Sequence, residues 1–278
     1  MKIKYLGTAA AEGIPALFCH CKTCEQARKN GGKDFRTRSQ SVIDNELLID
    51  FPADTYMHVL QHGLPLHKIK HCIITHSHED HLYPADLGMR APAFAPDLGE
   101  DSEPLHIYGS NAIKKASAHT MFYYNLNNVV EFHLIQPFTE YDIGGYKVVP
   151  MTALHDKLSG PYIYIISKGG KSLLYANDTG YFTDDTWEYL EKNPVKFDYV
   201  SLDCTAGVGP IDYDSHMNFE QNIAVKNRLL EIGCAGKDTV FCINHFSHNG
   251  GKILHEELSR EAAKEGFLTS FDGMEYEF

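Results

Sequence analysis

The sequence predicts an α/β protein in which two β-sheets are covered by helices. Short apolar runs alternate with loops along the whole chain, and a few stretches with helical spacing of apolar residues lie among them. The order of these elements does not alternate strictly between strand and helix, which favours two sheets with helices outside them. A hydrophobic content of 43% and a charged content of 22% are typical of a globular protein with a substantial core. We expect residues 1–278 to form a single domain.

The strand candidates are short apolar runs that are bounded by loop-forming residues. We expect strands at 1–7, 41–50, 71–75, 105–109, 129–135, 146–154, 162–168, 171–178, 199–203 and 238–244. The tetrapeptide KGGK, residues 168–171, separates two of these runs and predicts a tight hairpin, because glycine readily adopts the positive φ of such turns.

The helix candidates fall between the strands and near the end of the chain. We expect helices at 22–30, 53–62, 110–120, 183–192, 218–232 and 252–265. In the fifth of these, Ile223, Leu229, Leu230 and Ile232 lie near helical spacing and a glycine follows at the end.

Composition restricts the location and the partners. The beginning, MKIKYLGTAAAEG, contains no signal-peptide core, and no segment approaches the ~18 consecutive apolar residues of a membrane span. Seven cysteines, an odd number, are too few for a disulfide scaffold. We therefore expect a cytoplasmic protein with no membrane partner. The net charge of −12 makes long nucleic acid a poor partner, but a bound metal can still attract a small anion.

Histidine and aspartate side chains follow four of the predicted strands. The heptad THSHEDH follows the apolar run Cys72–Ile74 and contains His76, His78, Asp80 and His81. Three later strands end at His155, Asp178 and His245. Imidazole and carboxylate groups suit divalent zinc, manganese or iron.

The spacing predicts two adjacent metal ions. His76 and His78 can point to one side of an irregular turn, where His155 completes a three-histidine group. Asp80 and His81 then point to the other side, where His245 joins them. Asp178 has two oxygens and can bridge the two ions, which in such sites lie ~3.5–4 Å apart and together activate a water. Glu79 is interpreted as a solvated neighbour.

A second cluster, Cys19, Cys21 and Cys24, supplies three thiolates at short spacing. A structural zinc needs a fourth ligand. The adjacent His20 is badly placed for it, and the distant His248 is a better candidate. The alternative is a set of reduced thiols or a redox pair. The other cysteines, which are Cys72, Cys204, Cys234 and Cys242, lie in or beside apolar runs and are expected in the core.

The heptad matches the T-H-x-H-x-D-H signature of the metallo-β-lactamase-fold hydrolases, and the later ligands follow in the order of that family. The resemblance implies a four-layer αββα sandwich with the dinuclear site at one edge of the sheets. It also implies that Asp50, at the end of LLID, supports the site. The alternative for Asp50 is the N-cap of the helix that begins near Pro52.

Within that family, the stretch GTAAAEGIPALFCHCKTCEQAR, together with HFSH and FDGMEYEF, resembles the PhnP-type phosphodiesterases of the carbon–phosphorus lyase pathway. The resemblance implies a structural zinc held by Cys19, Cys21, Cys24 and His248, in an N-terminal loop at about 12–30. It also places His216 near the substrate. Asp80 and His216 are thus the candidate catalytic residues, although His216 also fits a helix start with no catalytic role.

We therefore expect a dinuclear metal-dependent hydrolase with two divalent ions (Zn, Mn or Fe) and one structural zinc. The favoured substrate is a small or cyclic phosphodiester. The alternatives are a lactone or thioester hydrolase of the same fold and a tRNA 3′-processing nuclease, although the basic arm of such nucleases is not found. A non-catalytic carrier resembling a relative from pyrroloquinoline quinone biosynthesis is disfavoured, because all seven dinuclear ligands are present.

An insertion at about 82–104 is Pro-rich and net acidic. We expect it to form a wall of the pocket or a dimer contact, since relatives are often homodimers. Its Tyr83, Met89 and Phe94 could contact a small substrate, although ordinary loop packing is favoured.

Overall fold

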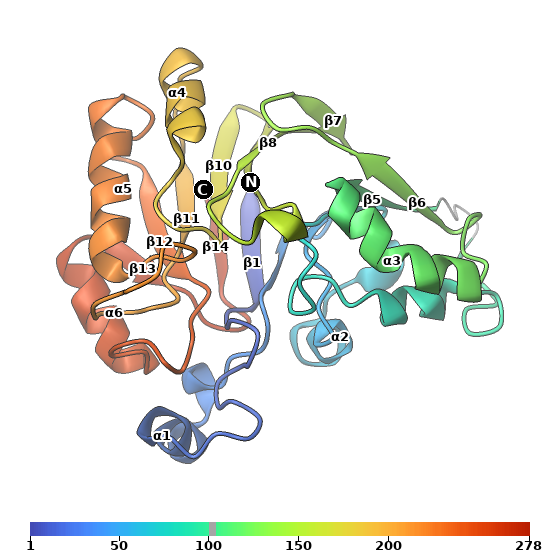
Figure 1. Cartoon of the computed structure of the whole chain (residues 1–278), viewed down its shortest axis with the longest axis horizontal. Helices are drawn as coiled ribbons and strands as arrows, with labels where there is room; N and C mark the ends of the chain where they lie inside the picture. The colour runs from blue at the N-terminus through green and yellow to red at the C-terminus, as the bar shows by residue number, and fades with distance from the viewer. Residues whose placement is uncertain (100–103) are drawn as a thin grey trace.

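The computed structural model describes residues 1–99 and 104–278, and Figure 1 shows their arrangement. The helices are α1 (Lys22–Asn30), α2 (Thr55–His62), α3 (Asn111–Tyr123), α4 (Asp184–Lys192), α5 (Phe219–Glu231) and α6 (His255–Lys264). The strands are β1 (Lys2–Gly7), β2 (Gln40–Ile43), β3 (Leu47–Ile49), β4 (His71–Ile73), β5 (Leu105–Gly109), β6 (Val130–Leu134), β7 (Tyr141–Ile143), β8 (Tyr146–Thr152), β9 (Tyr162–Lys168), β10 (Lys171–Ala176), β11 (Tyr199–Asp203), β12 (Val240–Asn244), β13 (Phe267–Thr269) and β14 (Glu275–Glu277).

The described strands form two seven-stranded mixed sheets. The first has the order β14-β1-β2-β3-β4-β5-β6, and the second has the order β13-β12-β11-β10-β9-β8-β7. In the first sheet, the strands from β3 to β6 are parallel, and in the second sheet those from β10 to β13 are parallel. Parallel strands deliver the residues that follow them to the same edge of a sheet.

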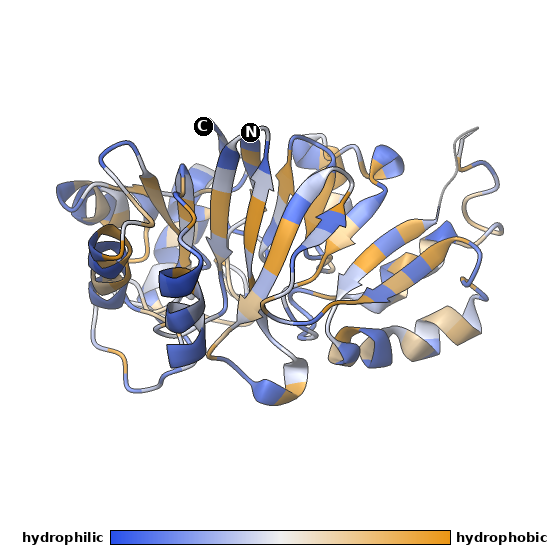
Figure 2. Ribbon diagram, turned by 90° about the horizontal axis from the view of Figure 1, so that it is seen from above, coloured by the Kyte–Doolittle hydropathy of each residue, from blue (hydrophilic) through white to orange (hydrophobic). Residues whose placement is uncertain are grey.

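Three apolar clusters define the layers. One lies between the two sheets and contains Ile3, Ile49, Tyr164 and Tyr175. A second packs the second sheet against α4, α5 and α6, and a third packs the first sheet against α2 and α3. Seen from above, apolar strand residues occupy the middle of the molecule and polar ones lie on the outer helices (Figure 2). The predicted αββα sandwich is therefore confirmed.

The two chain ends meet at the first sheet. Strand β1 pairs with the C-terminal strand β14, and the amino group of Met1 donates to the carbonyl oxygen of Phe278 at 3.1 Å. Helix α1 and the loop before it stand apart from the layers, at the lower end of the view in Figure 1.

Most predicted elements are present, including the hairpin at 168–171, where Gly169 and Gly170 both have positive φ. One expected strand, 41–50, is instead the hairpin β2–β3, because Asp44 and Asn45 adopt positive φ and turn the chain. Strands β7, β13 and β14 were not predicted. In the described part of the chain, no helix is long and apolar enough to span a membrane.

Candidate metal centre

The predicted ligands meet at the carboxyl ends of strands from both sheets. The segment His76–His81 follows β4 of the first sheet, while His155, Asp178 and His245 follow β8, β10 and β12 of the second. Asp178 and His245 have φ of 51° and 61°, in the left-handed region that non-glycine residues seldom adopt. Such backbone strain concentrates at functional sites.

One group of ring nitrogens is formed by His76, His78 and His155. His76 Nε2 lies 2.9 Å from His78 Nδ1, which in turn lies 3.2 Å from His155 Nε2. Their ligand atoms all lie within 4.8 Å of one another. This is the three-histidine group that the sequence predicts.

The second group is formed by Asp80, His81, Asp178 and His245, and it is also within 4.8 Å. Asp178 Oδ2 is in contact with His81 Nε2 and lies 3.0 Å from His245 Nε2. The same oxygen is 3.9 Å from His76 Nε2 of the first group. Asp178 therefore lies between the two groups, as expected for a bridging carboxylate.

Each imidazole directs one nitrogen into the cluster because its other nitrogen has an acceptor outside it. His81 Nδ1 donates to Asp50 Oδ2 at 2.6 Å, and His245 Nδ1 donates to Thr205 Oγ1 at 2.8 Å. The other three face Thr75 Oγ1 (from His76 Nδ1, 3.1 Å), Asp156 Oδ2 (from His78 Nε2, 3.3 Å) and Ser215 O (from His155 Nδ1, 3.1 Å). Such outer partners fix the tautomer and orientation of metal-binding histidines.

Asp50 has the supporting position that the resemblance implies. Its buried carboxylate accepts hydrogen bonds from the backbone N–H and hydroxyl of Thr75 at 2.7 and 2.9 Å, besides that from His81. Helix α2 has Asp54 as its N-cap residue, so the alternative role of Asp50 as N-cap is not observed.

Buried carboxylates and imidazoles lie close together in the cluster, and they shift one another's pKa values. Burial opposes ionisation of Asp178, but His245 and His81 hold the pKa of this carboxyl well below its usual range. Burial likewise opposes protonation of His245, yet Asp178 raises the pKa of this imidazole to about 10. The carboxylates thus favour protons on His81 and His245, and metal binding would displace such protons.

The surroundings of Asp178 show that these residues suit a metal ion. Its Oδ2 is buried and accepts no hydrogen bond of good geometry from the described residues. Imidazole nitrogens surround it, and each has its other nitrogen already partnered. A buried oxygen among convergent nitrogens fits divalent cations of the zinc, manganese or iron type.

His216 lies beside the cluster, and its ring centre is 5.0 Å from that of His155 and 5.7 Å from that of His245. Its Nδ1 is 3.0 Å from Asp203 Oδ2. Burial opposes protonation of His216, but the carboxylate of Asp203 raises the pKa of this imidazole above its usual value. Asp203 also accepts from Thr205, the partner of His245.

Asp203 was not predicted as a site residue. It is the last residue of β11, so the strand-exit pattern that indicates Asp178 and His245 also applies to it. Its neighbours Thr205 and Ser215 carry no such signal in the sequence. Glu79 is exposed, as expected.

The cysteine cluster is brought together with His248. The Sγ atoms of Cys19, Cys21 and Cys24 and a ring nitrogen of His248 lie within 4.8 Å of one another, with Cys21 Sγ 3.4 Å from His248 Nδ1. The His20 ring is exposed and pairs with Glu25 at 3.0 Å, so it points away. Burial opposes ionisation of Cys21, but the N–H of Cys24 and His248 lower the pKa of this thiol to about 6. Cys21 is also the N-cap of α1, where the helix dipole favours a thiolate.

The insertion packs on neighbouring elements. The ring of Phe94 contacts that of Tyr124 at the end of α3, and Met89 lines a cavity with Tyr56 and Val59 of α2. Tyr83 precedes the short 3-10 helix Pro84–Arg90. Residues 100–103 of the predicted insertion lie outside the described residues.

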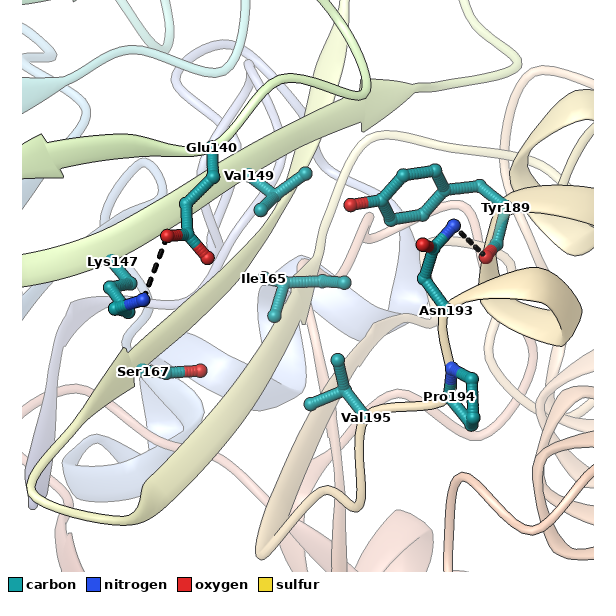
Figure 3. A pocket seen from close by; sticks show the side chains of 9 residues that line it. All are labelled: Glu140, Lys147, Val149, Ile165, Ser167, Tyr189, Asn193, Pro194 and Val195. Carbon is teal, nitrogen blue, oxygen red and sulfur yellow. Dashed lines mark hydrogen bonds and ion pairs between the residues drawn. The ribbon is translucent and has the colours of Figure 1, made fainter.

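A pocket of about 330 Å³ lies on the second sheet, between β8, β9 and the segment 193–195 (Figure 3). Val149 and Ile165 form its floor, and Lys147 is paired with Glu140 at 2.8 Å. None of the predicted site residues lines it, so the chemistry is expected at the metal centre.

Comparisons with known proteins agree with this architecture. The family model described as the Beta-lactamase superfamily domain matches residues 45–231, more than half of the chain. No curated protein sequence gives a significant match.

Solved structures of the same fold cover the whole chain. A new diphosphatase from the PhnP family has a TM-score of 0.74 at 22% identity, covering 100% of this chain and 97% of that one. Zn²⁺-bound PqqB from Methylobacterium extorquens has a TM-score of 0.72 at 17% identity, covering 100% of both. The short form of human tRNase Z has a TM-score of 0.63 at 15% identity, covering 100% of this chain and 99% of that one. At these identities the likeness establishes the fold alone.

Proposed function

The chain belongs to the beta-lactamase superfamily, as a metal-dependent hydrolase of the metallo-β-lactamase fold, and from this premise we propose that it hydrolyses a small or cyclic phosphodiester. The fold alone does not select a substrate, so the proposal depends on the site.

Seven residues would hold two divalent cations. One ion is assigned to His76, His78 and His155, the other to Asp80, His81 and His245, and Asp178 is shared. When bound, the cations would supply a nucleophile at neutral pH and neutralise charge on the leaving oxygen. Asp80, whose pKa His81 holds below its usual range against the effect of burial, remains ionised for this purpose.

The observation that carries the proposal is the pair formed by His216 and Asp203 at the rim of the centre. Asp203 accepts from His216 Nδ1, which leaves Nε2 as the nitrogen available to a substrate. Asp203 also favours the protonated imidazole, since its charge lies 3.0 Å away. An imidazolium there can bind a phosphate oxygen and protonate a departing alkoxide.

The net charge of the protein favours a small substrate over a long polyanion. A net charge of −12 repels a long polyanion, whereas a single phosphodiester needs only the local positive charge of the centre. The resemblance of the N-terminal segment to PhnP-type phosphodiesterases also supports phosphate-ester chemistry, and one protein of the same fold is a diphosphatase from the PhnP family.

The test is a substrate panel with the protein loaded with manganese or zinc. We expect turnover of bis-(p-nitrophenyl) phosphate and of 2′,3′- or 1,2-cyclic phosphates, and little of lactones, thioesters or tRNA precursors. Hydrolysis of a lactone or thioester without phosphodiesterase activity would overturn the substrate class. His216→Gln should lower turnover, whereas His119→Gln, on the exposed face of α3, should not.

A further inference from the structure

A further group of candidate metal ligands lies on the first sheet, away from the candidate metal centre and from the cysteine cluster. His106 of β5 and Glu131 of β6 face each other across the parallel pair, and His133 follows Glu131 by two residues. Because side chains of a strand alternate between the two faces, all three project from the same face.

The group lies apart from the catalytic ligands. His106 is paired with His71, the first residue of β4. The segment His76–His81, which carries candidate ligands of the metal centre, begins beyond the last residue of that strand. We propose that His106, Glu131 and His133 bind one divalent transition-metal ion such as Zn²⁺, Ni²⁺ or Cu²⁺.

The distances are those of a coordination sphere. His106 Nδ1 lies 2.9 Å from His133 Nε2 and 3.5 Å from Glu131 Oε2, and His133 Nε2 lies 3.8 Å from Glu131 Oε1. With metal–ligand bonds of ~2.0–2.2 Å, neighbouring ligands of a tetrahedral ion are separated by roughly 3.3 Å. The separation of 2.9 Å is shorter than this value, and those of 3.5 and 3.8 Å are longer.

Aromatic neighbours hold both imidazoles in place. The ring of His71 stacks on His106 at 5.4 Å, and that of Tyr108 stacks on His133 at 4.6 Å. Supported rotamers of this kind reduce the reorganisation that metal binding requires.

The ligand set selects the class of ion. Two imidazoles and one carboxylate suit zinc, nickel and copper, whereas magnesium and calcium prefer oxygen ligands. The side chain of Glu131 is 54% exposed, so the fourth position of the ion faces solvent. Strand β6 is the edge of its sheet, and a bound ion would join it to β5.

The site is tested by calorimetric titration with Zn²⁺. The protein is first loaded with metal and then freed of excess ion. The wild type should bind one further equivalent, and so should His119→Gln, a control that removes an exposed histidine from α3. The double variant His106→Gln, His133→Gln should lose this equivalent. Glu131→Gln should weaken it by more than about tenfold, which is the lower end of the loss caused by removing even an outer-sphere partner.

Two results would overturn the proposal. In one, the wild type binds no further equivalent, and the histidine pair is then a simple hydrogen bond. In the other, the substitutions leave the further equivalent at its original affinity. Glu131→Gln decides alone if the double variant does not fold, since Glu131 is exposed. As a second readout, Zn²⁺ should slow amide exchange in β6 of the wild type and of His119→Gln, but not in the double variant.

Discussion

At the scale of single residues, Asp178 contacts both ligand groups, and its replacement removes the shared ligand without opening the apolar core. We expect Asp178→Ala to abolish turnover and to leave the fold largely intact, because its Oδ2 has no structural hydrogen bond within the described residues. Steady-state kinetics and circular dichroism check both parts. Asp238→Ala, at an exposed aspartate, is the matched control. Near-normal activity of Asp178→Ala would refute the dinuclear assignment.

Asp203 is predicted to act through His216 and His245 and not on the substrate itself. Asp203→Asn keeps the shape but removes the charge that favours protonated His216. The alkaline limb of its pH–rate profile, which reports the loss of the His216 proton, should therefore move to lower pH, and kcat should fall about 10²-fold or more, the range of general acid–base effects. A profile unchanged in position, with kcat lower, would indicate a structural role only.

The sequence identifies the ligand residues because their types are rare together and follow strands directly. It identifies the supporting residues less well. Thr205 and Ser215 act through a hydroxyl and a backbone carbonyl, which have no distinctive residue pattern. Asp203 ends β11 and so fits the same strand-exit rule, but no histidine stands beside it in the sequence to mark it as a site residue.

At the scale of elements, the cysteine cluster, which is a candidate zinc site, brings the start of α1 together with the segment after β12. We expect Cys21→Ser to lower the melting temperature more than it lowers kcat, because a structural zinc contributes directly to folding. Thermal unfolding and zinc analysis measure this. The matched control is Lys22→Ser, one residue further along, which leaves all four candidate ligands in place. Cys234→Ser is unsuitable as a control because that thiol is buried. An unchanged melting temperature in Cys21→Ser would argue against the zinc.

Helix α2 is tied to the first sheet by a buried neutral histidine. His58 Nδ1 donates to Gln40 Oε1 at 2.6 Å, and Gln40 in turn donates to the backbone carbonyl of Asp50 at 2.9 Å. Burial, with a smaller effect of His62, lowers the pKa of His58 to about 3.

The unfolded chain therefore binds a proton at His58 near pH 6.5, and the folded protein only near pH 3. The stability that this histidine contributes is present above pH 6.5 and is lost as the pH falls towards 3. Between pH 7 and pH 5, we expect about 2 kcal/mol of the loss in unfolding free energy to come from His58. Urea titrations of wild type and His58→Gln at both pH values measure it. Equal losses in both proteins would contradict the prediction.

Among the elements, the sequence predicts long apolar runs and periodic helices well. Strands β7, β13 and β14 have only three residues each, so their local apolar pattern is short. Strand β7 pairs with the adjacent β8, whereas β13 and β14 pair with strands that are separated from them in the sequence. For β14, pairing with β1 is a tertiary contact across nearly the entire sequence, which a local pattern does not contain. The β2–β3 hairpin was predicted as one strand, whereas Asp44 and Asn45 adopt positive φ and turn the chain between its two apolar runs.

At the scale of the whole molecule, the metal centre joins the two sheets. Its ligands follow β4 on one side and β8, β10 and β12 on the other, so bound cations would cross-link the layers. A ligand that binds only the folded state stabilises it by about 4 kcal/mol at a thousandfold excess over its dissociation constant. For a domain of this size, such a change corresponds to a melting-temperature shift on the order of 10 °C.

Removal of the metals by a chelator should therefore lower the melting temperature of the wild type by about that amount, and added zinc or manganese should restore it. In Asp178→Ala the same treatment should cause a smaller fall, because this variant lacks the shared ligand and keeps only the cysteine site intact. In Cys21→Ser the fall should come mainly from the dinuclear site. Differential scanning calorimetry of the three proteins separates these contributions. Equal falls in the wild type and in Asp178→Ala would mean that the cysteine site alone stabilises the fold and that the dinuclear centre does not link the sheets.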